Sequence, residues 1–476
     1  MLKLPSSRLL KNKYLYTNPL NMKKYLLSCM VLASLSSSAQ EQYTGIGLSS
    51  RVGVLNAQFN PAELHNQSNK FDIHLIGFNA RVSNNKLGVD DIVNNDNLEN
   101  ILFRGTDPVN LSANVQAMGL GMSVKFKRWT LGISSTLHGN LDIIDVDPRL
   151  GDAFVNAGIN ALIGGSATVS NNYNQRVNGT TWGELGATAA FSLVNKAKHK
   201  LNVGITGKLL FPGSYANLGM DRFTGTISRV GGNAFLTNTQ ASVNIAYSGT
   251  LANSFTQFDN YRESAFGGLN GVGADIGINY QWRDTPPENP KKNQNRYKLN
   301  LGLAIRNLGA MTFNENNNQS TNYTLSIQGT QSLNLNQFEN VESLREIETI
   351  LLNSGYLTRR DGTRDFRVQL PTTLSLYGDV KIIPKLFVSA YLLQRLNDVE
   401  VNDQIVTQNT FIVTPHVDLG FFEIFVPFTQ NEISGFNTGL AFRAGGFFIG
   451  SSSGVTALMT NAKQADFYMG WRIGIF

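Results

Sequence analysis

The sequence predicts an all-β chain that forms a transmembrane antiparallel β-barrel of about 14 strands, with about 16 as the alternative count. The main evidence for this barrel is a set of long segments in which apolar and polar residues alternate, such as Gly271–Arg283 and Lys298–Arg306. Side chains alternate faces along a strand, so each segment has one apolar and one polar face. Both segments suit a tilted crossing of a bilayer better than a typical soluble strand. A soluble antiparallel sandwich is the alternative, because its strands also have one dry face.

Residues 1–39 predict a leader with a secretory signal peptide. Met22-Lys23-Lys24 gives a cationic start, Tyr25–Leu35 a short apolar core, and Ser37-Ser38-Ala39 the small residues of a cleavage site. We expect cleavage after Ala39 and a mature chain that starts at Gln40. Residues 1–21 are interpreted as an upstream extension or a misassigned start.

The formal charge of +6 comes from this leader, which contains basic residues and no acidic ones. The rest of the chain is balanced, so a basic surface for nucleic acid is excluded. Cys29 is the only cysteine, and it lies in the leader. The mature chain is therefore expected to lack disulfides, thiolate metal sites and a cysteine nucleophile. After the leader, no apolar run is long enough for a transmembrane helix.

Residues 40–69 form a separate segment before the alternation begins. Asn60-Pro61 predicts a turn, and Ala62–His65 predicts a short helix after it. Residues 70–476 form the predicted barrel. Alternating segments are expected at 71–75, 111–126, 129–139, 181–194, 201–211, 238–248, 271–283, 297–308, 321–335, 366–381, 386–396, 409–417, 421–428, 436–443, 446–451 and 465–476.

The connections between these segments differ in length. Tight turns are expected at 127–128, 195–200, 383–385 and 444–445, and long polar loops at 83–110, 142–180, 212–236 and 336–365. If the first strand starts in the periplasm, the tight turns fall at the periplasmic end and the long loops outside, as in outer-membrane barrels. Gln337–Leu352 has apolar residues at helical spacing and is the best helix candidate.

No motif for catalysis is complete. Gly450–Gly454 matches G-x-S-x-G, but no histidine follows it, so a polar turn is the preferred interpretation. The five histidines are scattered without metal-ligand spacing, and Asp142, Asp145 and Asp147 are interpreted as a solvated loop rather than a calcium site. We expect no enzyme activity, no metal and no cofactor. An outer-membrane lipase stays a remote alternative.

The polar faces predict a charged lumen. The residues expected to point inward are Asp72, His74, Lys208, Asp275, Arg283, Arg306, Asp379, Arg443 and Arg472. Charges in such a place need partners or water, because an isolated buried charge is costly. The first and last strands must pair to close a barrel, so Asp72 or His74 is expected to contact Arg472.

Several stretches resemble the FadL-like outer-membrane barrels, in particular the Bacteroidetes-type branch that includes PorV and uncharacterised relatives. They are Phe59–Leu64, Gly271–Gly277, Asn307–Gly309 and Leu370–Leu374. The resemblance covers most of residues 44–476 and implies about 14 strands with the N-terminal segment inside the lumen. Residues 40–69 would then be a plug-like segment, with Asn60, Pro61 and Ala62 as its motif.

The expected function follows from this barrel and its location in the outer membrane. The preferred interpretation is an accessory or scaffold barrel that presents loops 142–180 and 336–365 to partner proteins in a cell-surface or secretion assembly. The alternative is a transporter of small hydrophobic molecules. Expected partners are outer-membrane lipid, other outer-membrane or secreted proteins, and hydrophobic small molecules, but no nucleic acid. A packed lumen favours the scaffold, and a continuous apolar cavity that reaches the wall favours transport.

Overall fold

The computed structural model describes residues 43–49, 51–95, 97–156, 165–253, 267–283, 297–314, 317–339 and 341–475. The expected leader, its cleavage after Ala39, the new start at Gln40 and the terminal Phe476 lie outside these described residues. Residues 284–296 also lie outside them.

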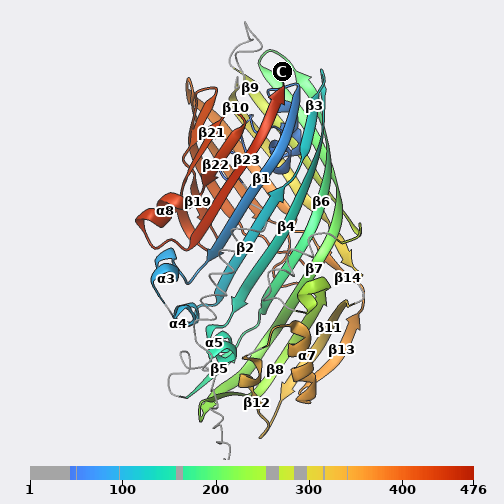
Figure 1. The fold of residues 1–476 in the computed structure, drawn as a ribbon, viewed down its shortest axis with the longest axis vertical. Helices are drawn as coiled ribbons and strands as arrows, with labels where there is room; N and C mark the ends of the chain where they lie inside the picture. Colours follow the sequence, from blue (N-terminus) through green and yellow to red (C-terminus); the bar gives the residue numbers. More distant parts are fainter. Residues whose placement is uncertain are drawn as a thin grey trace, which may run out of the picture.

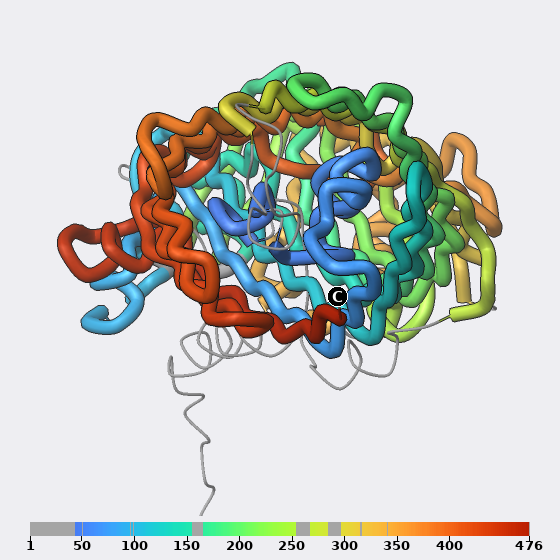
Figure 2. Tube along the Cα trace, turned by 90° about the horizontal axis from the view of Figure 1, so that it is seen from above, coloured from blue at the N-terminus to red at the C-terminus, as the bar shows by residue number. Residues whose placement is uncertain are grey.

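The strands form one antiparallel sheet that closes into a ring of 14 strands (Figures 1 and 2). In order around the ring these are β1 (Phe71–Asn84), β2 (Val109–Met118) continued by β3 (Gly121–Lys125), β4 (Trp129–Val146), β6 (Asn174–Asn195), β7 (His199–Val230), β9 (Gly271–Arg283), β10 (Tyr297–Phe313), β14 (Phe366–Gln369) continued by β15 (Thr373–Ile383), β16 (Leu386–Arg395), β17 (Thr410–Asp418), β18 (Phe422–Phe425) continued by β19 (Phe428–Asn431), β20 (Gly435–Thr438) continued by β21 (Leu440–Ala444), β22 (Phe447–Ser451) and β23 (Gln464–Ile475). β1 pairs with β23 from Phe71 opposite Ile475 to Ser83 opposite Gln464, which closes the ring. The predicted barrel is therefore confirmed.

A branch of the same sheet extends beyond one end of the barrel, and we call it the lobe (Figure 1). It consists of the far half of β7 with β5 (Ser166–Ser170), β8 (Asn233–Ser248), β11 (Gln319–Ile327), β12 (Leu333–Asn334) and β13 (Leu357–Thr363). β7 pairs with β9 over His199–Leu210 and with β8 over Tyr215–Val230, so this one strand belongs to both the ring and the lobe.

The sequence predicted about 16 strands as the alternative count, whereas the ring has 14, and the lobe accounts for the difference. The segments predicted at 238–248 and 321–335 are strands, but they pair in the lobe and not in the ring. The predicted loop 212–236 is wrong, because β7 continues through it for a total of 32 residues. The β-branched and aromatic residues of Phe223–Val230 favour a strand there despite the polar composition.

Apart from the helical turns of residues 53–66, the described helices lie at the end of the ring opposite the C-terminus (Figure 1). They are α3 (Val89–Asn94), α4 (Leu98–Leu102), α5 (Pro148–Asn156), the 3₁₀ turns η3 (Gly249–Ala252) and η4 (Leu335–Phe338), α7 (Leu344–Asn353) and α8 (Gly454–Met459). The helix predicted at 337–352 is shorter than expected, because Ser343 caps α7 by accepting a hydrogen bond from the Glu346 amide (3.2 Å). Within the described ranges, no helix has the length and apolar character to cross a membrane.

The outer surface of the ring is apolar. The exposed side chains include Trp129, Leu131, Ile133, Ile205, Val272, Ile276, Ile278, Trp282, Leu301, Leu303, Leu376, Phe411, Phe436, Met469, Trp471 and Ile473. Their neighbours in sequence face the lumen and are mostly polar and buried. Several aromatic residues gather at the end where β4 begins and β9 ends, namely Phe126, Trp129, Trp282, Phe421 and Phe422. An apolar outer face flanked by aromatic residues is typical of a barrel embedded in lipid.

The loops are sorted between the two ends of the ring. Tight turns join β3 to β4, β6 to β7, β15 to β16, β17 to β18 and β21 to β22, all at the end where β1 begins and β23 ends. The opposite end has the helices and the lobe. Short turns at this end in the described part of the chain include 432–434, which joins β19 to β20 in the ring, and 231–232, which joins β7 to β8 in the lobe. Outer-membrane barrels have short periplasmic turns and longer external loops. The chain is thus an outer-membrane β-barrel with the lobe at the cell surface.

A charge on the lipid face is expected to destabilise the barrel. Leu303 lies mid-strand on β10, between Ile278 of β9 and Leu376 of β15. Leu303→Arg should reduce the free energy of unfolding in liposomes by about 2–4 kcal/mol, the cost of arginine near the bilayer midplane. Val230→Arg, at an exposed site in the lobe, is the control and should have little effect. Urea unfolding in liposomes measures both, and equal losses would contradict the lipid-facing assignment.

Candidate functional site

Residues 43–49 and 51–69 lie inside the ring (Figure 2). Their ordered parts are η1 (Gly53–Leu55), α2 (Asn56–Phe59) and η2 (Pro61–Asn66). Almost every side chain in this segment is buried. The segment, which we call the plug, packs on strands β4, β6, β7 and β9 through η2 and on β1 through η1.

The motif Asn60-Pro61-Ala62 starts η2 and attaches it to the wall. The Asn60 side-chain oxygen accepts a hydrogen bond from the Ala62 amide (2.9 Å), and Pro61 occupies the first helical position. The Asn60 side-chain amide donates to the Ile278 carbonyl (2.9 Å) and to the Tyr377 hydroxyl (3.1 Å). One residue therefore caps the helix and joins it to β9 and β15.

Two glycines of the wall make room for this motif. A Cβ at Gly277 would lie 1.9 Å from the Asn60 side-chain oxygen, and a Cβ at Gly204 would lie 2.4 Å from the backbone of Pro61 and Ala62. Such distances are impossible without a shift of the plug. The glycine at the end of the Gly271–Gly277 stretch thus has a packing role, which the sequence did not reveal.

Glu63 is the main polar contact between plug and wall. One carboxylate oxygen accepts hydrogen bonds from Asn279 (2.7 Å), Asn300 (2.8 Å) and the Tyr377 hydroxyl (2.7 Å). The other oxygen accepts from Asn66 of the plug itself (2.5 Å). Burial raises the pKa of Glu63, although its hydrogen bonds and the Lys200 charge act in the opposite direction.

Lys200 and His65 complete this contact. The Lys200 ammonium donates to the His65 carbonyl (3.1 Å) and to the Asn66 side-chain oxygen (2.6 Å). Burial, and secondly the charge of Lys200, lowers the pKa of His65 to about 2, so its ring stays neutral. No role for Glu63 or Lys200 was predicted from the sequence. An acidic residue within the otherwise uncharged Phe59–Leu64 was the only available signal.

Of the residues expected in the lumen, all but Arg283 are buried. Arg283 is half-buried near the periplasmic turns, where it donates to the Asn195 side chain (3.2 Å). Arg472 forms an ion pair with Asp72 and lies opposite His74 in the register, so the seam between the first and last strands contains the expected contact. A Cβ at Gly53 would collide with Asp72, which shows that the plug packs directly on this seam.

The remaining lumen charges form two further groups. Lys208 lies 3.0 Å from Asp275 and 3.4 Å from Glu184, and donates to the Asn307 side chain (2.6 Å). With Arg306, whose guanidinium donates to Tyr391 (3.2 Å), these residues line a polar cavity of about 40 Å³. His138 stacks on Trp182 in the same cavity, with ring centroids 4.4 Å apart.

The other group lies nearer the periplasm. Arg443 donates to Glu423 (2.6 Å), which also accepts from the Ser49 hydroxyl of the plug (2.7 Å). Asp379 accepts from the Tyr297 hydroxyl (2.6 Å) and lies 3.2 Å from His416. The acidic partners Glu184 and Glu423 were missed, because a single sequence does not reveal which strands are neighbours.

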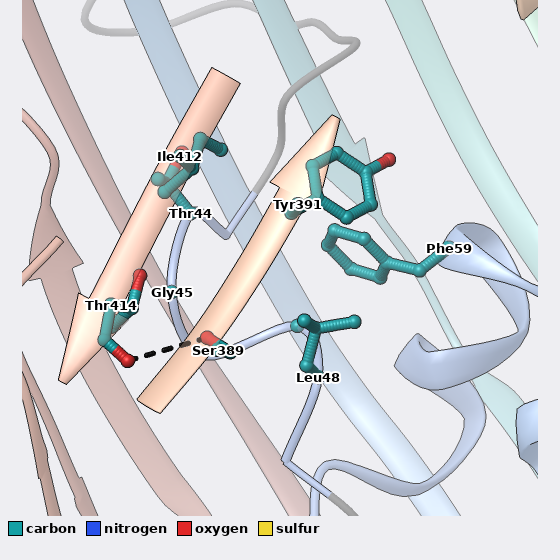
Figure 3. Close-up of a pocket in the computed structure, with 9 residues that line it drawn as sticks. Thr44, Gly45, Leu48, Phe59, Ser389, Tyr391, Ile412 and Thr414 are labelled. Atoms are coloured by element: carbon teal, nitrogen blue, oxygen red, sulfur yellow. Dashed lines mark hydrogen bonds between the residues drawn. The ribbon is translucent and has the colours of Figure 1, made fainter. Parts of the chain in front are cut away.

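A smaller and more apolar cavity lies between the plug and the wall (Figure 3). Its volume is about 20 Å³, and Leu48, Phe59, Tyr391 and Ile412 supply its apolar surface. Figure 3 shows the Phe59 and Tyr391 rings side by side, and they pack edge to face with centroids 6.1 Å apart and an interplanar angle of 77°. Gly45 approaches the wall closely and has a left-handed backbone (φ 82°) that favours glycine.

The residues considered for catalysis have structural contacts. In the G-x-S-x-G stretch, the hydroxyl of the motif serine, Ser452, accepts a hydrogen bond from the Gln464 side chain (3.0 Å), and the Ser452 amide donates to Asp466 (2.7 Å). Asp142, Asp145 and Asp147 accept from Ser112, Asn110 and Arg149, respectively. Within the described ranges, no group of three His, Cys, Asp or Glu residues has the geometry of a metal site.

The chain belongs to a family of unknown function, DUF5723, whose model matches residues 61–452. The search of curated proteins gave no match. Among solved structures, the fold is similar to that of the toluene transporter TbuX of Ralstonia pickettii (12% identity, TM-score 0.39, covering 89% of this chain and 94% of that one). It is also similar to a FadL homologue of Pseudomonas aeruginosa (10%, 0.39, 92% and 98%) and to the toluene transporter TodX of Pseudomonas putida (10%, 0.36, 92% and 93%). Likenesses at this level assign no substrate to the present chain.

A larger residue at Gly204 is expected to displace the plug. Gly204→Val should reduce the free energy of unfolding by about 1–3 kcal/mol, as overpacking does, and should speed tryptic cleavage after Arg51. Gly207→Val is the matched control, because a Cβ at Gly207 of the same strand meets no atom within 4 Å. Urea unfolding and timed proteolysis measure the two effects. Equal behaviour of the two variants would contradict the packing of η2 on β7.

The contact around Glu63 predicts a pH dependence of stability. Because burial raises the pKa of Glu63 above its ordinary value of 4.5, the folded barrel holds this proton more tightly than the unfolded chain. The resulting stabilisation is complete below pH 4.5 and is lost as the pH rises through the raised pKa. Relative to Glu63→Gln, the wild type should therefore lose stability as the pH increases over this window.

Urea unfolding at a series of pH values measures this difference. Glu342→Gln, at an exposed position before α7, is the control and should follow the wild type. A wild type that gains stability over Glu63→Gln with rising pH would overturn the direction given for this pKa.

Proposed function

We propose that this protein is a non-enzymatic accessory barrel that holds the lobe at the cell surface and presents it to a partner protein. The proposal is supported by the hydrogen bonds between plug and wall together with a well-packed lobe. In the lumen, the plug contacts the wall through Glu63, Asn60 and Ser49, and each of these contacts uses buried hydrogen bonds. A passing apolar molecule would have to break these bonds without replacing them, which is costly.

The lobe has its own hydrophobic core. Ile227, Leu236, Val243, Tyr323 and Leu325 are buried in one cluster together with residues of α5 and α7. Glu348 of α7 accepts hydrogen bonds from the hydroxyls of Tyr247 (3.0 Å) and Tyr323. A cluster of this kind supports a rigid surface, and rigid surfaces bind partners at a lower entropic cost.

The edge of the lobe offers a surface for a partner. Among the described strands, β13 pairs only with β11, and every residue from Thr358 to Thr363 is exposed. Arg359, Arg360, Arg364 and Arg367 are exposed on and just after this strand. An unpaired edge can accept an added strand, and clustered arginines select for acidic groups. An extended acidic segment of a partner protein fits both features.

Transport of a small hydrophobic molecule is the second candidate. The apolar cavity of Figure 3 favours it, because Leu48, Phe59 and Ile412 could contact such a molecule. A role within a secretion assembly, suggested by the resemblance to the branch with PorV, also stays a prediction.

Charge reversal at the edge of the lobe tests the scaffold proposal. The protein and its bound partners are purified from native membranes in mild detergent and quantified by mass spectrometry. Arg359→Glu with Arg360→Glu should release the main partner, because the acidic segment would meet like charges. Arg229→Glu, at an exposed site where β7 ends in the same lobe, is the matched control and should retain it.

A partner retained by both variants would place the docking surface elsewhere, and the absence of any stoichiometric partner would overturn the scaffold role. Uptake of a radiolabelled fatty acid into proteoliposomes tests the alternative. Uptake by the wild type that Leu48→Trp abolishes, by filling the apolar cavity, would establish transport.

A further inference from the structure

Helix α8 exposes apolar side chains outside the barrel. Figure 1 shows it projecting sideways from the wall near β19, on a level with the ends of the strands beside it. Leu458 is 90% exposed and Met459 is 77% exposed, more than any other large apolar residue in the described part of the chain. Such exposure to water is unfavourable. It needs an explanation when both side chains lie on one short helix.

The helix is held firmly in this position. The Thr456 hydroxyl accepts a hydrogen bond from the Thr438 amide (2.6 Å) at the end of β20, and donates to the Thr438 carbonyl (3.3 Å). At its start, the Gly454 amide donates to the Ser451 hydroxyl (2.8 Å), and Ser453 is bonded to Asp466 of β23. The exposed residues therefore result from a fixed packing of α8 on the ends of β20 and β23.

The surface beside α8 is the lipid-facing belt of the barrel. Phe436 of β20, 59% exposed, stacks on Phe428 of β19 with centroids 6.4 Å apart. Phe467 of β23 is exposed on the same outer face. Since α8 packs on β20 and β23, its apolar residues continue the surface that these phenylalanines present to lipid.

The composition of the segment suits the same environment. No charged residue occurs from Ser451 to Ala462. Charged side chains are costly to bring into the hydrocarbon, whereas short apolar groups at the interface gain free energy by leaving water. Lys463 follows directly, and its ammonium donates to the Asn85 carbonyl (2.8 Å) on the outer side.

We propose that α8 is an interfacial anchor, with Leu458 and Met459 inserted among the acyl chains of the outer leaflet. The occupant is lipid because the exposed residues are continuous with the lipid-facing belt. The anchor lies on the opposite side of the ring from the lobe (Figure 1). It therefore fixes the depth of the barrel in the membrane at a second point, independently of any partner of the lobe.

Spin labelling at α8 tests this proposal. A nitroxide is attached at Leu458→Cys in a chain with Cys29→Ser, and the protein is placed in phosphatidylethanolamine and phosphatidylglycerol liposomes. Its collision rates with oxygen, which concentrates in lipid, and with a water-soluble nickel chelate are compared. Ile276→Cys on the belt and Val230→Cys in the lobe, both exposed, serve as references for lipid and water. Met459→Cys gives a second label on the same helix.

The ratio of oxygen to nickel collisions at Leu458→Cys and Met459→Cys should be several-fold higher than at Val230→Cys and close to that at Ile276→Cys. A ratio equal to that of Val230→Cys would place α8 in water and overturn the anchor. Low collision rates with both reagents in native membranes would mean that a protein covers the helix, which would also overturn it.

Discussion

The pairing of β1 with β23 is the constraint on which the rest of the structure depends. In hydrocarbon, every backbone N–H and C=O needs a partner within the protein, so a spanning sheet cannot have a free edge. The two strands meet over their whole length, from Phe71 opposite Ile475 to Ser83 opposite Gln464. Once the ring is closed, one face of each strand meets lipid and the other meets a lumen of limited width.

The closed ring then determines what the interior can contain. Inward side chains have little access to water, so each charge needs a local partner. Asp72 pairs with Arg472 at the seam, Lys208 with Asp275, and Glu423 with Arg443. The plug takes part in the same set of bonds and does not simply fill space. Buried polar contacts thus hold the seam, the lumen and the plug, in contrast to the hydrophobic core of the lobe.

Much of the fold could be predicted because alternation is a local property. The strands, their inward faces and the contact between Asp72 and Arg472 follow from two facts alone: side chains alternate between the two faces of a strand, and the first and last strands must pair to close the ring. The limits have physical causes as well. Alternation does not distinguish a strand in lipid from a strand in a lobe, so β8 and β11 were counted in the ring. The partners of Arg443 and the role of Glu63 depend on which strands lie side by side, and this is information that a single sequence lacks.

The length of β7 has a mechanical consequence. Its 32 residues form one unbroken strand that is hydrogen-bonded into the wall along its first half and into the lobe along its second. A hinge between the two bodies would require several of these bonds to open together. A pull on the lobe along the strand direction therefore acts as a shear force between β7 and its neighbours β6 and β9. The hydrogen bonds between these strands share this force, because they bear it at the same time. The lobe is therefore connected rigidly to the barrel, and a force applied to the lobe at the cell surface is carried by the barrel wall.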